Sequence, residues 1–206
     1  MTLSDLRYFA PVMDKMKDTL MIEGTFNGFV SDFDLDDFAF EFKDSTNFLG
    51  TIRMKGLPKF FDTHINANVQ KMNTTYQDLS EFYIPTPTET IPLPQSLDIL
   101  DKILVSGTYD GFYNKLNDTE FNLHTNIGNI YMKMETKHDN DVDSIFANIY
   151  TNNLNIADLL GVDDEFVVTM NSNLKGKGTS IDDADMELAV NVKELKLLNN
   201  TYKNLA

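Results

Sequence analysis

Histidines are the first side chains to test for catalysis in this chain of 206 residues, which contains no cysteine and therefore no thiolate nucleophile. His64 precedes a stretch of alternating apolar and polar residues, His124 lies inside another, and His138 opens an acidic loop. Neither a Ser-His-Asp order nor the His spacing of a zinc-protease helix accompanies them. We therefore expect exposed strand or loop histidines and no catalytic residue.

Acidic residues could instead bind a metal, and the run Asp139–Asp143 has acids at the first, third and fifth positions of a calcium loop. Such a loop needs Gly at its sixth position and Glu at its twelfth, where Ser144 and Tyr150 stand. We expect a solvated acidic turn here. Nothing in the sequence selects a pair of carboxylates for glycoside cleavage either. Neither a metal nor a cofactor is predicted.

The charge balance excludes one large class of partner. The chain has 17 Lys and Arg against 32 Asp and Glu, a formal net charge of −15. Binding nucleic acid requires clustered basic residues, so this class is excluded. A hydrophobic fraction of 42% predicts a globular chain. The first residues do not have the pattern of a signal peptide, which is expected both of a cytosolic protein and of a repetitive domain cut from a longer secreted or membrane-anchored chain.

Most of the chain alternates between apolar and polar residues, which predicts strands with one apolar and one solvated face. The pattern is clearest at Phe38–Phe42, Ile65–Val69, Ile130–Met134 and Met186–Val192, and it slips once at Asp36–Asp37, as a bulge or a turn would require. We predict a mostly β fold of roughly ten to thirteen strands, mainly antiparallel.

Helical signals are few. An N-terminal helix is predicted over 4–18, although Pro11 interrupts it. Segments 75–82 and 155–161 each contain an Asp-Leu pair and predict one or two helical turns, the second ended by Gly161.

A proline-rich segment divides the chain. Four of the six prolines lie between 85 and 94, which excludes a central strand there. We therefore predict a first unit over 1–84, a connection over 85–97, and a second unit with the start of a third over 98–206, joined as one continuous sheet.

The two units resemble each other in sequence. Gly24–Phe29 matches Gly107–Phe112 at an offset of 83 residues, and Asp78-Leu79 matches Asp158-Leu159 at an offset of 80. Each unit is interpreted as a meander of about five strands that ends in an Asp-Leu turn, with a third unit starting near Leu174. Repetition of this kind builds a stacked sheet in which each unit packs against its neighbours.

Large apolar side chains recur on one face of the predicted strands. An ordinary filled core is one interpretation, and a curved sheet with an apolar concave face that accommodates flexible acyl chains is the other. The residues predicted to line such a groove are Phe38, Phe40, Phe42, Ile52, Met54, Ile65, Ala67, Val69, Phe121, Leu123, Ile130, Met132, Met134, Val168 and Met170.

Five segments carry a family resemblance. Ser4–Pro11, Ile22–Gly28, Ile99–Phe112 and Leu154–Gly161 resemble the TamB/AsmA-like family of Bacteroidetes-type bacteria. Leu195–Tyr202 resembles the same family, although it has Asn-Thr where Gly is usual.

The resemblance implies a U-shaped sheet, a β-taco or repeating β-groove, in a non-enzymatic bridge-like lipid-transfer protein. Its partners would be phospholipids or acyl chains, carried through the periplasm between the inner and outer membranes, and it would also support assembly of outer-membrane proteins. The full-length parent would be anchored in the inner membrane and would contact an outer-membrane barrel protein. A structural or adhesion module with a filled core is the alternative, and a carbohydrate-active enzyme is a third, which the absence of Trp disfavours.

Overall fold

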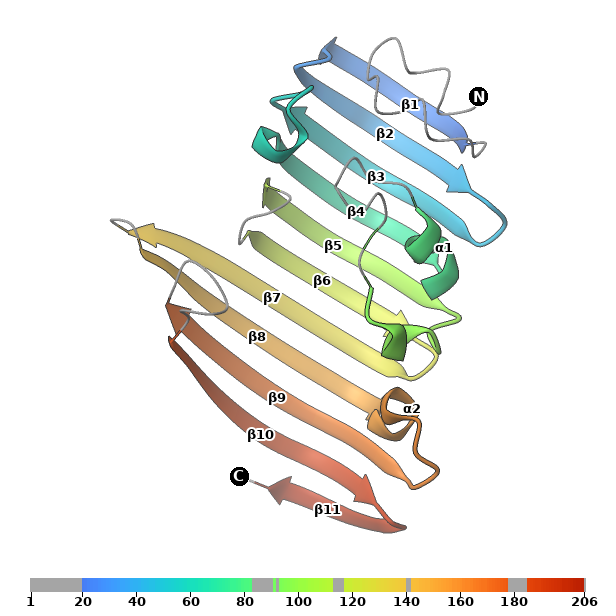
Figure 1. Cartoon of the computed structure of the whole chain (residues 1–206), viewed down its shortest axis with the longest axis vertical. Coiled ribbons are helices and arrows are strands. Elements are labelled where there is room, and N and C mark those ends of the chain that lie inside the picture. Colours follow the sequence, from blue (N-terminus) through green and yellow to red (C-terminus); the bar gives the residue numbers. More distant parts are fainter. Residues whose placement is uncertain are drawn as a thin grey trace.

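The computed structural model describes residues 20–82, 91, 93–112, 117–139, 142–177 and 185–205. Eleven strands form a single sheet in which every strand pairs with its neighbours in the chain, from β1 to β11 (Figure 1). All ten pairings are antiparallel. The predicted mostly β, antiparallel class is confirmed.

Strands of ten or more residues make up most of the sheet. The strands are β1 (Leu20–Phe29), β2 (Asp32–Phe42), β3 (Thr46–Lys55), β4 (His64–Thr74), β5 (Ile103–Phe112), β6 (Asp118–Thr125), β7 (Gly128–Asp139), β8 (Val142–Asn155), β9 (Phe166–Lys177), β10 (Asp185–Leu197) and β11 (Asn200–Leu205). The helices are short: η3 (Phe60–Asp62), α1 (Tyr76–Glu81), η4 (Gln95–Leu97) and α2 (Ile156–Leu160).

The slip in the alternation at Asp36–Asp37 is a β-bulge. The pairing of β2 with β3 shifts register between Leu35 and Phe38, and Asp37 has a φ of 49°. The extra residue keeps Leu35 and Phe38 on the same face of the sheet, which strict alternation would not allow. This sequence prediction is confirmed.

The predicted size of the repeating unit is wrong: a unit contains four strands and a short helix. The matching segments Gly24–Phe29 and Gly107–Phe112 lie in β1 and β5, and the two Asp-Leu pairs lie in α1 and α2. One unit therefore runs from β1 to α1 and the next from β5 to α2. The third unit starts with β9 at Phe166. The predicted start, Leu174, lies near the end of that strand, so the prediction was too late in the chain.

Two predictions concern segments that the structure describes in part or not at all. The N-terminal helix over 4–18 lies outside the described residues, as does most of the proline-rich connection. Within the connection, η4 is described, and β4 and β5 on either side of it pair directly with each other. The sheet is therefore continuous across the boundary between the first two units.

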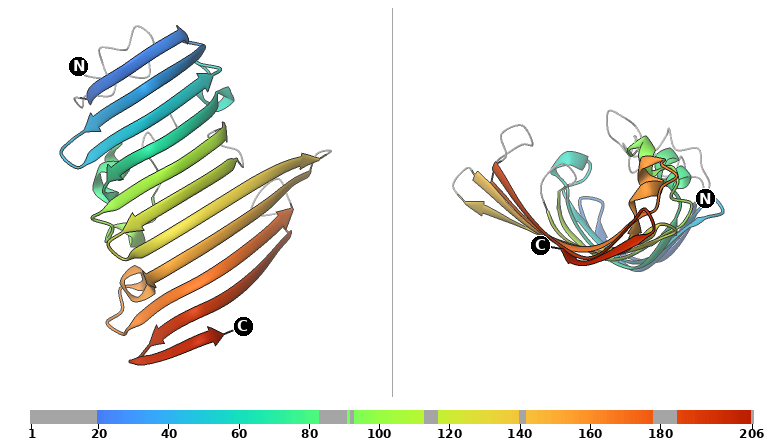
Figure 2. Two further views of the ribbon diagram at one scale, coloured as in Figure 1. Left: turned by 180° about the vertical axis from the view of Figure 1, so that it is seen from behind. Right: turned by 90° about the horizontal axis from the view of Figure 1, so that it is seen from below.

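The sheet is open and modestly bowed, and its helices lie on the concave side. Figure 2 shows this bow in the view along the stack of strands, with α1, η4 and α2 gathered near one end of the strands. We call this end the helix rim. The N-termini of α1 and α2 are each capped by a side chain. Thr75 accepts a hydrogen bond from the backbone N–H of Asp78, and Asn155 accepts one from the backbone N–H of Asp158.

Candidate functional site: the apolar face of the sheet

Strand register aligns apolar side chains into rows that cross the sheet, and we call the surface they form the apolar face. The first row crosses all eleven strands with a single polar member, Thr151, while the second crosses ten strands and includes Thr119. The first row is Ile22, Phe40, Phe48, Met72, Val105, Leu123, Ile130, Thr151, Met170, Val192 and Leu205. The second is Phe26, Leu35, Ile52, Ala67, Tyr109, Thr119, Met134, Ala147, Leu174 and Leu188.

All fifteen residues predicted to line a groove lie on this face. Only Phe42, Val69 and Val168 among them are buried, and the others are half-buried. Within the described residues the chain forms one sheet, so no second sheet covers these side chains. The structure thus brings the predicted residues together on one surface that remains partly open to solvent.

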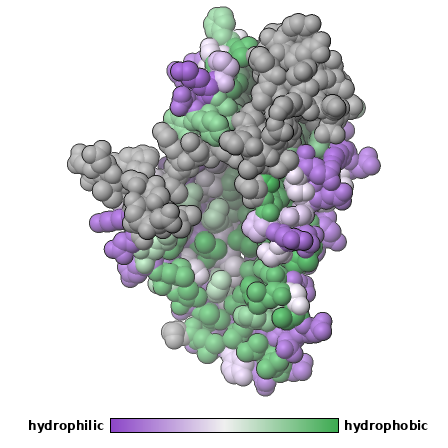
Figure 3. Space-filling view, in the orientation of Figure 1, coloured by the Kyte–Doolittle hydropathy of each residue, from purple (hydrophilic) through white to green (hydrophobic). Residues whose placement is uncertain are grey.

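The apolar face extends further toward both ends of the sheet than the sequence prediction. On β1, Phe26 is 52% exposed, and on β10, Met186 and Leu188 are 47% and 61% exposed. Figure 3 shows hydrophobic side chains gathered over the C-terminal strands, flanked by hydrophilic ones. The same period-two alternation that identified the central residues was present in these two strands and could have identified them as well.

The opposite face is mainly polar and carries cross-strand ion pairs, although Leu49 and Phe146 are exposed on it. Arg53 lies 3.3 Å from Asp34, and Lys55 lies 3.2 Å from Asp32, each pair in register between β2 and β3. These side chains are well exposed, so the pairs add little stability and mainly keep the convex face solvated. The two faces of this sheet therefore differ sharply in chemistry.

Helix α2 covers part of the apolar face by direct packing. Ile127, Leu154 and Val168 form a buried cluster, and Ile156 and Leu159 of α2 pack against it. Apolar contact of this kind fixes the helix on the sheet.

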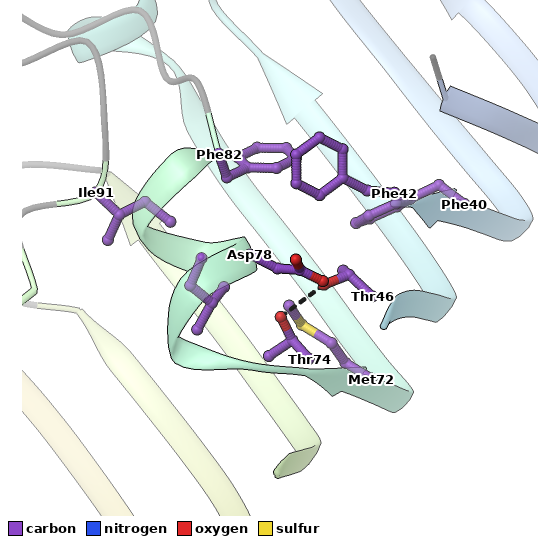
Figure 4. A pocket seen from close by; sticks show the side chains of 9 residues that line it. Phe40, Phe42, Thr46, Met72, Thr74, Asp78, Phe82 and Ile91 are labelled. Atoms are coloured by element: carbon purple, nitrogen blue, oxygen red, sulfur yellow. Dashed lines mark hydrogen bonds between the residues drawn. The ribbon is translucent and has the colours of Figure 1, made fainter. Parts of the chain in front are cut away.

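Helix α1 meets the sheet through a polar contact beside a small cavity (Figure 4). The Thr46 hydroxyl donates to the Asp78 carboxylate at 2.8 Å and lies 2.7 Å from the Thr74 hydroxyl. All three residues are buried. Phe82, directly after α1, packs edge-on against Phe42 with their ring centroids 5.3 Å apart.

One titratable group of the second row is perturbed by its surroundings. Burial raises the pKa of Tyr109, and the hydrogen bond from Asn117 partly opposes this shift. The Tyr109 hydroxyl donates to the carbonyl of Phe112 at 2.9 Å and accepts from Asn117 Nδ2 at 2.7 Å. Tyr109 therefore stays neutral at ordinary pH and is compatible with an apolar surface.

The two histidines whose side chains the structure describes lie away from the apolar face. His64 Nε2 is 2.9 Å from Asp110, and His124 Nδ1 is 2.9 Å from Asn129, both on the polar face. His138 falls in β7, and its side chain is outside the described set. Among the described residues, no group of three metal-ligating side chains comes together, and no helix there is long and apolar enough to cross a membrane.

Comparison with known proteins yields no match, whether to family models, to curated proteins or to solved structures.

Proposed function

We propose that this chain is a segment of a TamB/AsmA-like envelope protein whose apolar face holds the acyl chains of phospholipids as they pass between membranes. The observation that supports this most is the set of mostly apolar rows on the concave side of a single open sheet. The resemblance of five sequence segments to that family is the basis for proposing lipid as the ligand, a periplasmic location and a non-enzymatic role.

The chemistry of the face suits a flexible apolar ligand. Six of the 21 residues in the two rows are Met or Phe, and thioether and aromatic side chains adapt to ligands of irregular shape. Each methylene removed from water contributes about 0.8 kcal/mol, so ten methylenes on the face give about 8 kcal/mol before the entropic costs of binding. This is enough to extract a chain from water without any specific polar contact. The head group would remain at the edge of the sheet.

The competing proposal is a structural or adhesion module with a closed core. In that case, other protein segments would fill the concave side completely and exclude acyl chains. The half-buried state of Phe40, Met132 and Met134 favours the lipid proposal, because a closed core would bury them.

Lipid capture by two variants distinguishes the proposals. Met132 lies in the middle of the apolar face, and Met132→Asp places a charge among its neighbours. Asn148→Asp places the same group on the polar face, on the next strand. Native mass spectrometry after purification without detergent should detect phospholipid on the wild type and on Asn148→Asp but much less on Met132→Asp, with circular dichroism confirming that all three fold. A wild-type chain without any bound lipid would contradict the proposal.

A further inference from the structure

The two repeat-equivalent helices meet the sheet in different ways. The Asp-Leu pair of α2 places Leu159 on a filled apolar cluster and leaves Asp158 exposed, paired with Asn155 of its own cap. The same pair in α1 buries Asp78, which accepts a hydrogen bond from a strand residue, Thr46. The α1 junction therefore departs from the arrangement that fills the equivalent space under α2.

A cavity of about 110 Å³ lies at this junction between α1 and the sheet, and we call it the α1 cavity. Its wall is formed by Phe40, Phe42, Thr46, Met72, Thr74, Asp78, Leu79, Phe82 and Ile91. The polar side chains in this set bond to one another (Figure 4), and the surface that lines the cavity is apolar. An apolar surface of this kind offers water no hydrogen-bond partner, so its contact with hydrocarbon is favoured over its contact with water.

The α1 cavity is continuous with the apolar face. Along β2 and β4, away from the helix rim, Phe40 and Met72 in its wall are followed on the same face by Phe38 and Val69 and then by members of the second row. A chain lying along the apolar face can therefore enter the cavity without crossing a polar barrier. The cavity lies at the helix rim, so the other end of such a chain would point toward the opposite rim.

We propose that the α1 cavity binds the methyl end of a linear acyl chain, an inference that rests on the proposed function and adds an orientation to it. The small volume of the site excludes bulkier hydrocarbons, and its apolar surface excludes the head-group end. Tails point under α1 and head groups lie away from the helix rim. The equivalent position under α2 is filled, so it binds no chain.

Two photoreactive phospholipids test this orientation on the wild-type chain. Both are phosphatidylcholines, one with a diazirine at the methyl end of an acyl chain and the other with a diazirine next to its carboxyl group, each mixed into phosphatidylcholine vesicles. We expect the methyl-end probe to cross-link within 72–82 and 40–46, and the carboxyl-end probe to cross-link elsewhere on the apolar face.

A variant that fills the α1 cavity should lose the preference of the methyl-end probe for that cavity. Leu79→Trp places a large side chain in the cavity and displaces about two to three methylenes of the acyl chain from it. The loss of their burial should lower cross-linking of the methyl-end probe in the cavity by about tenfold or more. Leu160→Trp is the matched control, because Leu160 is 64% exposed at the end of α2. It should leave cross-linking unchanged.

The possible outcomes separate the two proposals. If neither probe labels the apolar face, the proposed function fails. If both probes label the face but the methyl-end probe shows no preference for the α1 cavity, lipid binding stands and the inferred orientation is overturned. Both of these outcomes are read from the wild type, so they do not depend on the folding of Leu79→Trp.

Discussion

Phe42→Ala should destabilise the chain far more than truncation of an exposed phenylalanine. Phe42 is 2% exposed, and its ring packs edge-on against Phe82 at 5.3 Å. Removing a buried phenylalanine side chain costs about 3–5 kcal/mol, because apolar contacts are lost and a cavity remains. Phe29, at the end of β1, is 80% exposed, so Phe29→Ala should change stability by no more than about 0.5 kcal/mol.

Thermal unfolding followed by far-UV circular dichroism measures both effects. For a chain of this size, each kcal/mol shifts the midpoint by about 2–4 °C, so Phe42→Ala should lower it by about 6–20 °C. Phe29→Ala should shift it by about 2 °C or less. Equal shifts for the two variants would refute the assignment of Phe42 to the buried junction between α1 and the sheet.

Three further predictions follow from the contacts. Gly107→Ala should lower the free energy of unfolding in urea by about 2–6 kcal/mol, because Gly107 has a φ of 149° and a Cβ there would lie 1.9 Å from a backbone oxygen of β6. Gly176→Ala is the control and should cost less than about 1 kcal/mol, because its Cβ would meet nothing closer than 3.4 Å. Equal losses of stability in the two variants would contradict this prediction. Thr46→Val should lower the free energy of unfolding by about 1–3 kcal/mol in the same assay, because the buried Asp78 carboxylate loses the hydroxyl that donates to it. An unchanged free energy of unfolding would show that this hydrogen bond does not stabilise the fold. The raised pKa of Tyr109 stabilises the fold below the ordinary tyrosine pKa of about 10, and this contribution is lost as pH rises through the higher pKa of the folded state. Tyr109→Phe should therefore reduce the fall of the urea midpoint with rising pH in the alkaline range. The same fall of the midpoint in the variant and the wild type would contradict this prediction.

The strand pattern could be predicted from the sequence because a side-chain period of two is a local property. The bulge at Asp36–Asp37 was predictable for the same reason, since the extra residue interrupts the alternation. The number of strands in a repeat was not predictable, because similar residues do not reveal which segments pair. Only the pairing of β4 with β5 established where one unit meets the next.

The site was predictable as a face but not as a shape. Alternation placed Met132 and Met134 on one side of their strand, yet alignment with Phe121 and Ala147 depends on register between strands. The α1 cavity could not be predicted at all. Its lining includes Asp78 and Thr46, which lie more than thirty positions apart and bond to each other, and no local pattern encodes that contact.

Site-specific fluorescence tests the central claim, that acyl chains occupy the apolar face, most directly. The chain contains no cysteine, so Met132→Cys and Lys133→Cys each give a single labelling position, on the apolar and the polar face respectively. With an environment-sensitive dye on each, addition of phospholipid vesicles should shift the emission to the blue for Met132→Cys and leave Lys133→Cys unchanged. No shift at position 132, or equal shifts at both positions, would contradict the claim.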